Sequence, residues 1–424
     1  MPDAPLAATI FAVTYAVIVS ERVHKTTAAL LGAVIMIAAR VLDQEEAFDA
    51  IDFNVIFLLA GMMIIVSVLG KTGVFQWLAI PSAKLGRGEP LRILIILSLV
   101  TAVASAFLDN VTAVVLIAPV TIFVAGSLRV SAVPFLISEA FASNIGGTAT
   151  LIGDPPNILI GSAAGLDFID FLVHLTPLIV VLLVLYLLAA RLFFFRGVRP
   201  NAQVRQRIME LDERQVITDL PLLRVSLAVL ALTLLGFLLH GPLDYEPASV
   251  ALLGASLLLL VTRQDPHDVL REIEWPTLFF FIGLFIVVGG VEEVGILENL
   301  GEKMADLTEG SRTASAFLIL WLSAVLSGIV DNIPYTAAMI PVVREMDADL
   351  GAGRDDVLWW ALALGAGLGG NVTIVAASAN VLVANLAERG GQRISFWEFF
   401  RYGVLVTVGT TAVSTAYLWL RYLV

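Results

Sequence analysis

The fold is decided by Ser105-Ala106-Phe107-Leu108-Asp109-Asn110-Val111-Thr112, where an acid and an amide interrupt a long apolar segment. The same pair recurs 222 positions later, in Ser327-Gly328-Ile329-Val330-Asp331-Asn332-Ile333-Pro334. A charged side chain at the centre of a bilayer costs about 2.5–3.5 kcal/mol on insertion scales, so it persists where it faces a cavity, a counter-ion or a proton equilibrium. The alternative is that Asp109 and Asp331 only cap the helices after them. The two interpretations are compatible, because a capping residue at a hairpin tip still presents its carboxylate.

The offset of 222 positions extends far beyond this pair of motifs. Identical residues at the paired positions include 29–32 with 251–254, Gly61 with Gly283 and, after one inserted residue, Gly146 with Gly369, Thr150 with Thr373 and Asn157 with Asn380. A long internal repeat of apolar segments is typical of membrane transporters. The sequence therefore predicts a first repeat at 1–195 and a second at 223–424, joined by a polar and basic linker at 196–222.

The composition is that of a polytopic membrane protein. The chain is 58% hydrophobic and 15% charged, and its mean hydropathy is +0.91. About ten stretches are long and apolar enough to span a bilayer. Two further runs, 91–127 and 313–343, are long enough to enter and return, with Asp-Asn at the middle. We predict an all-α fold of two inverted-topology repeats, each with about five transmembrane helices, one of them broken, and a re-entrant helical hairpin.

The distribution of charge predicts the orientation in the membrane. About 19 of the 25 Lys and Arg residues fall on one face, which the positive-inside rule makes cytoplasmic. Both termini then lie outside, and an odd number of crossings per repeat inverts the second copy. The first apolar stretch lacks a basic region before it, so we interpret it as a retained span of the inner (cytoplasmic) membrane. Segments 71–82 and 293–308 are predicted as interfacial helices, with short connectors as the alternative.

The second motif runs from Asn144 to Asn157 as Asn-Ile-Gly-Gly-Thr-Ala-Thr-Leu-Ile-Gly-Asp-Pro-Pro-Asn. Its glycines let the backbone leave the helix and its prolines forbid a smooth continuation, so the span at 131–165 is predicted to be broken. Unwound backbone at membrane depth survives where it lines protein or a wet cavity. In the second copy, at 357–387, Asp154 is replaced by Ala377, which predicts an asymmetric site. The alternative is a kink that serves packing alone.

These motifs supply the candidate site residues. Those predicted to bind substrate or ion are Asn110, Thr112, Thr148, Thr150, Asn157, Asn332, Asn371, Thr373 and Asn380. Those predicted to couple protons are Asp109, Asp154, Asp331 and Glu139, of which the last, lying mid-span, also fits a structural role. The chain has no cysteine, which excludes a disulfide, a thiolate metal site and a cysteine nucleophile. We predict no metal site, no cofactor and no nucleic-acid partner.

At these motifs the chain resembles the ArsB/NhaD permeases of the ion transporter superfamily, which include the bacterial arsenite efflux permease and the melanosomal P protein. The resemblance covers nearly the whole chain and implies a homodimer in which hairpins and broken helices move against a static scaffold. Citrate- or dicarboxylate-carrying relatives usually have Ser-Asn-Thr at the hairpin tips. Here those places hold Asp109-Asn110 and Asp331-Asn332, whose charge argues against an anionic substrate. Whether a soluble ATPase subunit docks on the chain stays open.

The resemblance permits two kinds of secondary transport, and neither is an enzymatic activity. The first is proton-driven efflux of arsenite or antimonite, for which hydroxyl and amide groups are suitable partners and the absence of a trapping thiol is consistent. The second is exchange of sodium for protons, because the same acids and carbonyls can bind a hard monovalent cation. We favour the metalloid, through the bacterial relatives. A remote alternative is an intramembrane aspartyl protease in which Asp109 and Asp331 share one proton, although their place in repeated hairpins argues against it.

Overall fold

The computed structural model describes residues 4–20, 22–194, 216–243, 245–350 and 355–424, and every regular element within these ranges is a helix. The helices of the first repeat are α1 (Ala4–Ser20), α2 (Lys25–Ala38), α3 (Gln44–Asp49), α4 (Phe53–Gly70), α5 (Val74–Leu85), α6 (Pro90–Leu108), α7 (Asn110–Leu128), α8 (Val133–Gly147), α9 (Pro155–Ala164), α10 (Phe168–His174) and α11 (Thr176–Phe193). Those of the second are α13 (Leu220–Leu243), α14 (Pro247–Thr262), α15 (Pro266–Leu270), α16 (Trp275–Glu293), α17 (Ile296–Leu307), α18 (Arg312–Ser327), α19 (Asn332–Asp349), α20 (Val357–Gly369), η2 (Ile374–Ala376), α21 (Ser378–Arg389), α22 (Phe396–Leu418) and η3 (Trp419–Leu423).

The elements recur at the same offset as the residues. α5 and α17 begin and end 222 positions apart, at Val74–Leu85 and Ile296–Leu307. α7 and α19 both begin at the Asn of the Asp-Asn pair. The exceptions include α10, because the second repeat passes from α21 to α22 through a loop, and η2, because no helix lies between α8 and α9. The duplicated sequence has therefore produced a duplicated order of helices.

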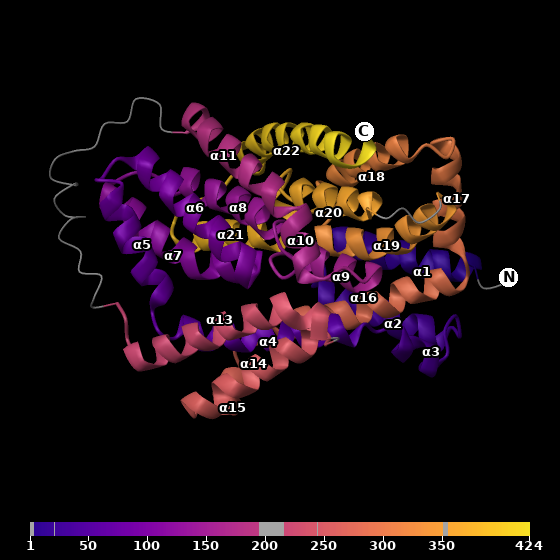
Figure 1. Ribbon diagram of the computed structural model, residues 1–424, viewed down its shortest axis with the longest axis horizontal. Helices are drawn as coiled ribbons and strands as arrows, with labels where there is room; N and C mark the ends of the chain where they lie inside the picture. Colours follow the sequence, from indigo (N-terminus) through magenta and orange to yellow (C-terminus); the bar gives the residue numbers. More distant parts are fainter. Residues whose placement is uncertain (1–3, 21, 195–215, 244, 351–354) are drawn as a thin grey trace.

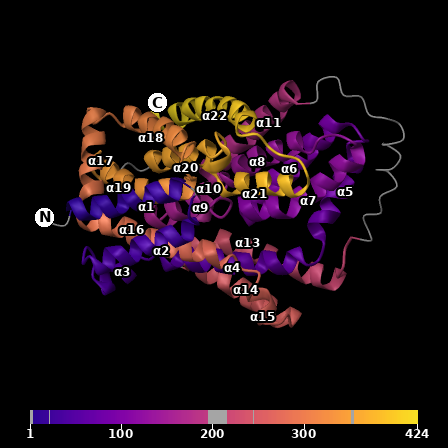
Figure 2. The ribbon, with the colours of Figure 1, turned by 180° about the vertical axis from the view of Figure 1, so that it is seen from behind.

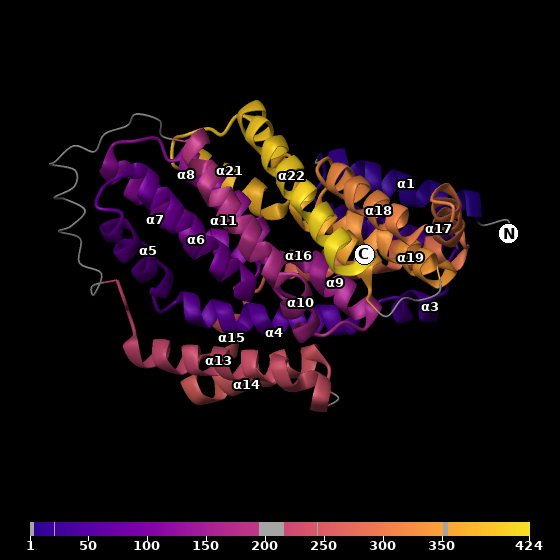
Figure 3. The same cartoon turned by 45° about the horizontal axis from the view of Figure 1, so that its top comes forward.

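Six helices form one layer, which we name the six-helix layer: α1, α2, α4, α13, α14 and α16. The repeats exchange partners within it, since α4 packs on α14 (Figures 1 and 3) and α16 packs on α2 (Figure 1). A Cβ on Gly61 would lie 2.8 Å from the carbonyl carbon of Ala251, and a Cβ on Gly283 would lie 2.7 Å from that of Ala29. Both crossings therefore depend on a residue without a side chain.

The second layer, which we name the hairpin layer, contains the hairpins α6–α7 and α18–α19 and the interrupted helices α8–α9 and α20–α21. The two hairpins lie at opposite ends of the molecule, next to α5 and α17 respectively, and both point toward its middle (Figures 1 and 2). Each second half-helix packs on the hairpin of the other repeat, α9 on α19 and α21 on α7. The two repeats therefore meet around one central region.

Both helices that the sequence predicts to be broken are broken. α8 ends at Gly147 and α9 begins at Pro155, while α20 ends at Gly369 and α21 begins at Ser378. The first halves pack closely on the hairpins, because a Cβ on Gly146 or on Gly369 would overlap the backbone of the hairpin arm beside it. Each glycine thus serves two purposes: it loosens the helix before the break and it lets the hairpin approach.

Among the described residues, six helices are long and apolar enough to cross a membrane: α4, α6, α7, α13, α16 and α22 with η3. Most of the other predicted spans are shorter apolar helices, such as α2 with 14 residues. α6 and α7 have the length of full spans, yet Asn110 at their turn bonds Asp154 at the break between α8 and α9, in the middle of the molecule. One bend differs from the sequence-based prediction, and one predicted segment is only partly described by the structure. α9 and α10 are bent by 112°, which the sequence did not predict, and most of the linker at 196–222 lies outside the described residues.

Candidate binding site at the hairpin tips

One buried carboxylate, that of Asp154, lies between the tips of both hairpins. Asn110 of the first tip donates from Nδ2 to Asp154 Oδ1 at 3.1 Å. Asn332 of the second tip donates from Nδ2 to Oδ1 at 3.4 Å and to Oδ2 at 3.3 Å. All three side chains are buried. The acid itself belongs to the first repeat alone, because Ala377 takes its place in the second.

The break between α8 and α9 aims Asp154 at these tips. Gly147 and Gly153 let the two sides of the break pass closely, since a Cβ on either would lie 2.5 Å from the carbonyl oxygen of the other. Asp154 has extended backbone, and Pro155 starts α9 with the fixed φ that suits a first turn. The Asp154 side chain makes no capping hydrogen bond to its own helix, so both oxygens are available to the hairpins. The positive end of the α9 dipole favours negative charge at this point.

Asn144 connects this acid to the second broken helix. Its Nδ2 donates to the Oδ1 atoms of Asn371 and Asn380, both at 3.1 Å, and its Oδ1 accepts from Asn110 at 3.4 Å. Asn144 also has no counterpart, because Gly367 replaces it in the second repeat. We name the connected group the amide–acid cluster; its members are Asn110, Asn144, Asp154, Asn332, Asn371 and Asn380.

The predicted threonines hold the breaks rather than face the cluster. Thr150 Oγ1 donates to the carbonyl of Ala106, and Thr373 Oγ1 donates to that of Gly328 at 2.9 Å. Each break is thereby tied to the hairpin of its own repeat. Thr148 Oγ1 donates to a carbonyl within α8 at 2.8 Å, which uses the proton of this hydroxyl and leaves its oxygen able to accept.

Asn157 and Asn380 close the two breaks in equivalent ways. Asn157 Nδ2 donates to the carbonyl of Thr150, and Asn380 Nδ2 donates to that of Thr373, each at 2.9 Å. These bonds satisfy carbonyls that the interrupted helices leave without an amide partner. The two Asn side chains therefore fix the unwound backbone, and Asn380 also contacts the amide–acid cluster through Oδ1.

Three buried amide atoms in the cluster and the adjoining break have no hydrogen-bond partner: Asn110 Oδ1, Asn157 Oδ1 and Asn371 Nδ2. Leaving a buried polar group unpaired costs about 1–3 kcal/mol, so nearly all such groups in proteins are satisfied. Two of these atoms accept and one donates. Together with Asp154, they are the candidate groups for contact with a small polar cargo.

The acids at the hairpin tips lie outside the cluster. Asp109 accepts from the backbone N–H of Thr112 at 2.8 Å and from its hydroxyl at 2.6 Å. Asp331 instead pairs with Lys25, whose Nζ lies 2.8 Å from Oδ2. No hydrogen bond joins Asp109 and Asp331 in the described part of the chain, so they do not form the proton-sharing pair that an aspartyl protease requires.

Glu139 also lies apart from the amide–acid cluster. It is fully buried in α8, where Thr121 Oγ1 donates to Oε1 at 2.5 Å and Oε2 has no partner. The second repeat has apolar residues at both equivalent positions, Val343 and Leu362. This polar pair is therefore another feature of the first repeat alone.

Two residues of the site were missed from the sequence, Asn144 and Lys25. Asn144 begins the Gly-rich motif and is aligned with Gly367 in the second repeat. Like the replacement of Asp154 by Ala377, this difference between the repeats could have identified it as a site residue. Lys25 carries no comparable signal. It lies at the start of a helix in a region of basic loop residues, and its partner is 306 positions away.

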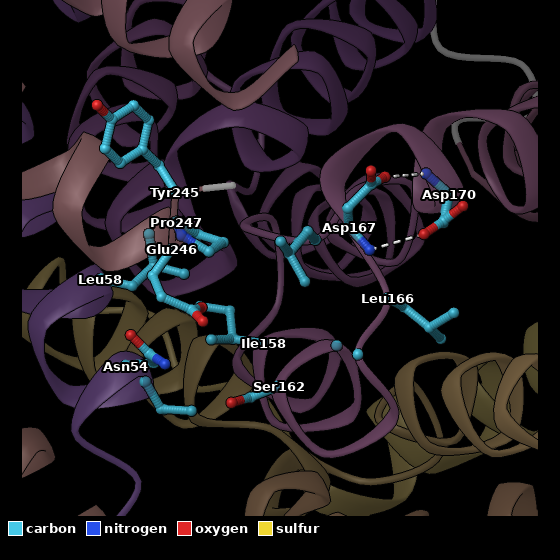
Figure 4. A pocket seen from close by; sticks show the side chains of 14 residues that line it. Asn54, Leu58, Ile158, Ser162, Leu166, Asp167, Asp170, Tyr245, Glu246 and Pro247 are labelled. Carbon is cyan, nitrogen blue, oxygen red and sulfur yellow. Dashed lines mark hydrogen bonds between the residues drawn. The ribbon is translucent and has the colours of Figure 1, made fainter. Parts of the chain in front are cut away.

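Two cavities lie at equivalent places between the layers. The first, of about 370 Å³, is lined by residues including Lys25, Asp331, Ser378 and Asn385. The second, of about 360 Å³, has Pro247 and Ser162 at the positions of Lys25 and Asn385 (Figure 4). Near its rim, Asp167 and Asp170 each accept from the backbone N–H of the other, at 2.8 and 2.7 Å, as a helix cap. The two cavities share a position but differ in charge.

Known proteins resemble the chain along its whole length. The model of the citrate transporter family, CitMHS, matches residues 15–365. An uncharacterized transporter of Mycobacterium tuberculosis strain H37Rv is 49% identical over 424 residues, covering 99% of both chains. The human P protein is 34% identical over 504 residues, covering 99% of this chain and 60% of its own length. The expected likeness to the P protein is confirmed, and the narrower ArsB/NhaD assignment stays a prediction.

Two solved transporters share the fold at low sequence identity. The YdaH transporter of Alcanivorax borkumensis superposes with a TM-score of 0.52 and 14% identity, covering 87% of this chain and 88% of that one. MtrF of Neisseria gonorrhoeae, from a class described as antimetabolite efflux pumps, gives a TM-score of 0.59 and 13% identity, covering 92% and 85%. The apolar helices, the paired hairpins and these likenesses agree. The chain belongs to the citrate transporter family and is a membrane transporter.

Proposed function

We propose that the chain is a secondary active transporter that moves arsenite or antimonite out of the cell in exchange for protons, with the amide–acid cluster as its cargo site. The observation that carries the proposal is the position of Asp154, a single buried acid bonded to the tips of both hairpins. Movement of either tip changes the surroundings of this acid. Such coupling between a midpoint site and two opposed repeats is what alternating access requires.

The unpaired atoms favour a neutral cargo that carries hydroxyl groups. Arsenous acid presents O–H donors to Asn110 Oδ1 and Asn157 Oδ1, and its oxygens accept from Asn371 Nδ2. A bare cation accepts no hydrogen bond and leaves the amide of Asn371 unpaired. A citrate trianion meets the carboxylate of Asp154, and no described Lys or Arg is bonded to the cluster to offset the repulsion.

Asp154 can alternate between cargo and proton. As a carboxylate it accepts a hydroxyl of the cargo, and as a carboxylic acid it directs its own O–H at the same place. The two ligands therefore compete for one group, and inward movement of the proton drives outward movement of the cargo. Asp109, Asp331 and Glu139 are held by Thr112, Lys25 and Thr121, so we assign the exchange itself to Asp154.

Exchange of sodium for protons is the second candidate. Asp154 together with the free oxygens of Asn110 and Asn157 is a set of hard ligands, which suits a monovalent cation. Under this alternative the same acid alternates between sodium and a proton.

The assembly completes the proposal. We place the protein in the inner membrane with both termini outside, as a homodimer whose hairpin layer moves against the six-helix layer. The exposed leucines of α13 and α14, such as Leu232, Leu235, Leu253 and Leu260, suit contact with lipid or with a second copy. Pull-down with the full chain tests whether a soluble ATPase subunit docks on this assembly.

The proposal is tested with the full-length protein in liposomes that contain a pH-sensitive dye. We expect arsenite supplied on one side to drive proton movement, and sodium or citrate supplied instead to drive little. Asp154→Asn should abolish the signal while Ala377→Asn, at the matched place in the second repeat, should retain it. A response to sodium alone selects the second candidate, and full activity of Asp154→Asn rejects the cluster as the cargo site.

A further inference from the structure

The ammonium group of Lys25 joins the two layers at the second hairpin tip. Lys25 begins α2 of the six-helix layer, and its Nζ lies 5.0 Å from the ring centre of Phe280 on α16. It donates to Asp331 Oδ2 at 2.8 Å and to Ser378 Oγ at 2.6 Å. Asp331 forms the turn of the second hairpin, and Ser378 starts the second half of the broken helix α20–α21. One cation thus holds both moving parts of the second repeat.

The first repeat has no such link. The counterparts of Lys25 and Ser378 are Pro247 and Pro155, neither of which can hydrogen-bond through a side chain. Asp109 is instead satisfied within its own hairpin by Thr112. The position of that threonine holds Pro334 in the second hairpin, so Asp331 lacks an internal hydroxyl partner. The cation from the other layer takes its place.

The ion pair lies on the wall of the 370 Å³ cavity described above. The side chains of Lys25 and Asp331 keep 26% and 15% of their surface exposed, so a proton has access to the carboxylate. His24 lines the same cavity, and no other titratable side chain lines it among the described residues. Asp154 lies beyond it, bonded to Asn332, which directly follows Asp331 in the chain.

We propose that Asp331 and Ser378 form a cation site separate from the amide–acid cluster, in which Lys25 is the resident cation and a proton entering from the cavity is its competitor. The proton adds to the Asp331 carboxylate, the ion pair breaks, and the ammonium group stays charged at the cavity wall. The second hairpin then loses one link to the six-helix layer, so that Asn332 can shift relative to Asp154. It keeps the bond from Tyr15 Oη to the Pro334 carbonyl at 2.9 Å and the ion pair of Arg344 with Glu292 at 2.8 Å. This gating role rests on the proposed transport function, whereas the site itself does not.

The site is tested without transport, by a double-mutant cycle on the purified full-length protein. Lys25→Met and Asp331→Asn should each lower the melting temperature in mildly alkaline buffer, and the double variant should lose much less than the sum. The effect of Lys25→Met should shrink on acidification, because the proton then removes the same ion pair in the wild type. The control pair is Lys71 with Glu272, 3.2 Å apart, whose acid is 47% exposed against 15% for Asp331, so we expect a smaller coupling there. Additive effects of Lys25→Met and Asp331→Asn would overturn the site.

The gating role is tested by joining the layers covalently. The chain has no cysteine, so Lys25→Cys with Ser378→Cys gives a unique pair for a short cleavable thiol cross-linker. We expect cross-linking to reduce transport more than tenfold, cleavage to restore it, and the Lys71→Cys, Glu272→Cys pair to have no effect. Unchanged transport by the cross-linked Lys25, Ser378 variant rejects the gating role. A wild type that moves no cargo rejects the proposed function instead, and the melting cycle still decides the site.

Discussion

The two hairpin tips begin from the same dipeptide and reach different chemistry. In the first, a single residue makes the turn: Asp109 has a φ of 92°, which is unusual for a residue with a side chain, and Thr112 satisfies its carboxylate. In the second, residues 328–331 make a longer turn, and Asp331 depends on Lys25 of the other layer. A duplicated motif therefore preserves position, while the residues around it decide what the carboxylate does.

The same contrast holds at the breaks. Both are closed by an Asn and a Thr in equivalent hydrogen bonds, although only the second contains the short helix η2. The groups that face the centre are not equivalent, because Asn144 and Asp154 stand opposite Gly367 and Ala377. The second repeat supplies the matching framework, and the first supplies the acid and the amide that connects it.

The strongest way to break this comparison is to move the acid from one repeat to the other. Asp154→Ala combined with Ala377→Asp keeps one buried carboxylate and places it in the second copy. We expect no recovery of transport, because Gly367 leaves the transplanted acid without the connecting amide that Asn144 provides. Proton-coupled uptake in liposomes measures this. Recovery to wild-type rate would mean that the two breaks are interchangeable.

The Thr112 hydroxyl, which only the first tip has, can be removed there and added at Pro334 of the second tip. Thr112→Val removes a hydrogen bond to the Asp109 carboxylate, and such bonds to charged groups contribute about 1.5–3 kcal/mol. Pro334→Thr in the Lys25→Met background gives Asp331 the internal partner that Asp109 has, and should recover part of the lost stability. Melting temperatures of the purified variants measure both effects. If Pro334→Thr rescues nothing, the tips differ for a reason other than this hydroxyl.

The two layer crossings should respond alike, in contrast to the tips. Gly61→Ala and Gly283→Ala each force a Cβ against backbone of the other repeat, and overpacking of this kind costs about 1–3 kcal/mol. Gly126→Ala in α7 is the control, because nothing lies within 4 Å of its added Cβ and alanine favours the helix. If Gly61→Ala and Gly283→Ala lower the melting temperature by different amounts, the two crossings are not equivalent.

The smallest change in stability is expected for Asp356, which directly precedes α20. Burial raises the pKa of Asp356, and the neighbouring charges of Asp347, Asp170 and Asp355 raise it further. A raised pKa means that the folded protein binds this proton more tightly than the unfolded chain, so stability rises as the pH falls through the folded value. Asp356→Asn should therefore increase the melting temperature at neutral pH by a small amount that disappears in acid. The first repeat has Val133 at this place. Val133→Asn removes no ionisable group, so as the control it should change the melting temperature by the same amount at neutral and acidic pH.

The sequence predicts the architecture because the internal repeat and the apolar segments can both be identified directly from it. The repeats, the turn positions at Asp109 and Asp331, the breaks after Gly147 and Gly369, and the lone Asp154 all follow from the offset of 222 and from Gly and Pro placement. The helices at 71–82 and 293–308 also form, as α5 and α17.

Side-chain partners were less accessible to this reasoning. Thr150 and Thr373 were predicted to meet cargo, yet they bond backbone carbonyls, because an unwound segment needs its own polar groups satisfied first. The pairing of Lys25 with Asp331 joins residues 306 positions apart, and no local pattern encodes it. The bend between α9 and α10 has no copy in the second repeat, so the duplication gave no signal for it.

The exchanged crossings have a consequence for how the protein is made. Gly61 of α4 packs against Ala251 of α14, and Gly283 of α16 packs against Ala29 of α2. Each half of the chain therefore finds the partners of these helices in the other half. A nascent chain must therefore hold its first half in the bilayer, incompletely packed, until the ribosome has delivered the second. Expression of the halves as separate polypeptides should give proteolysis of each alone and protection of both when they are synthesised together.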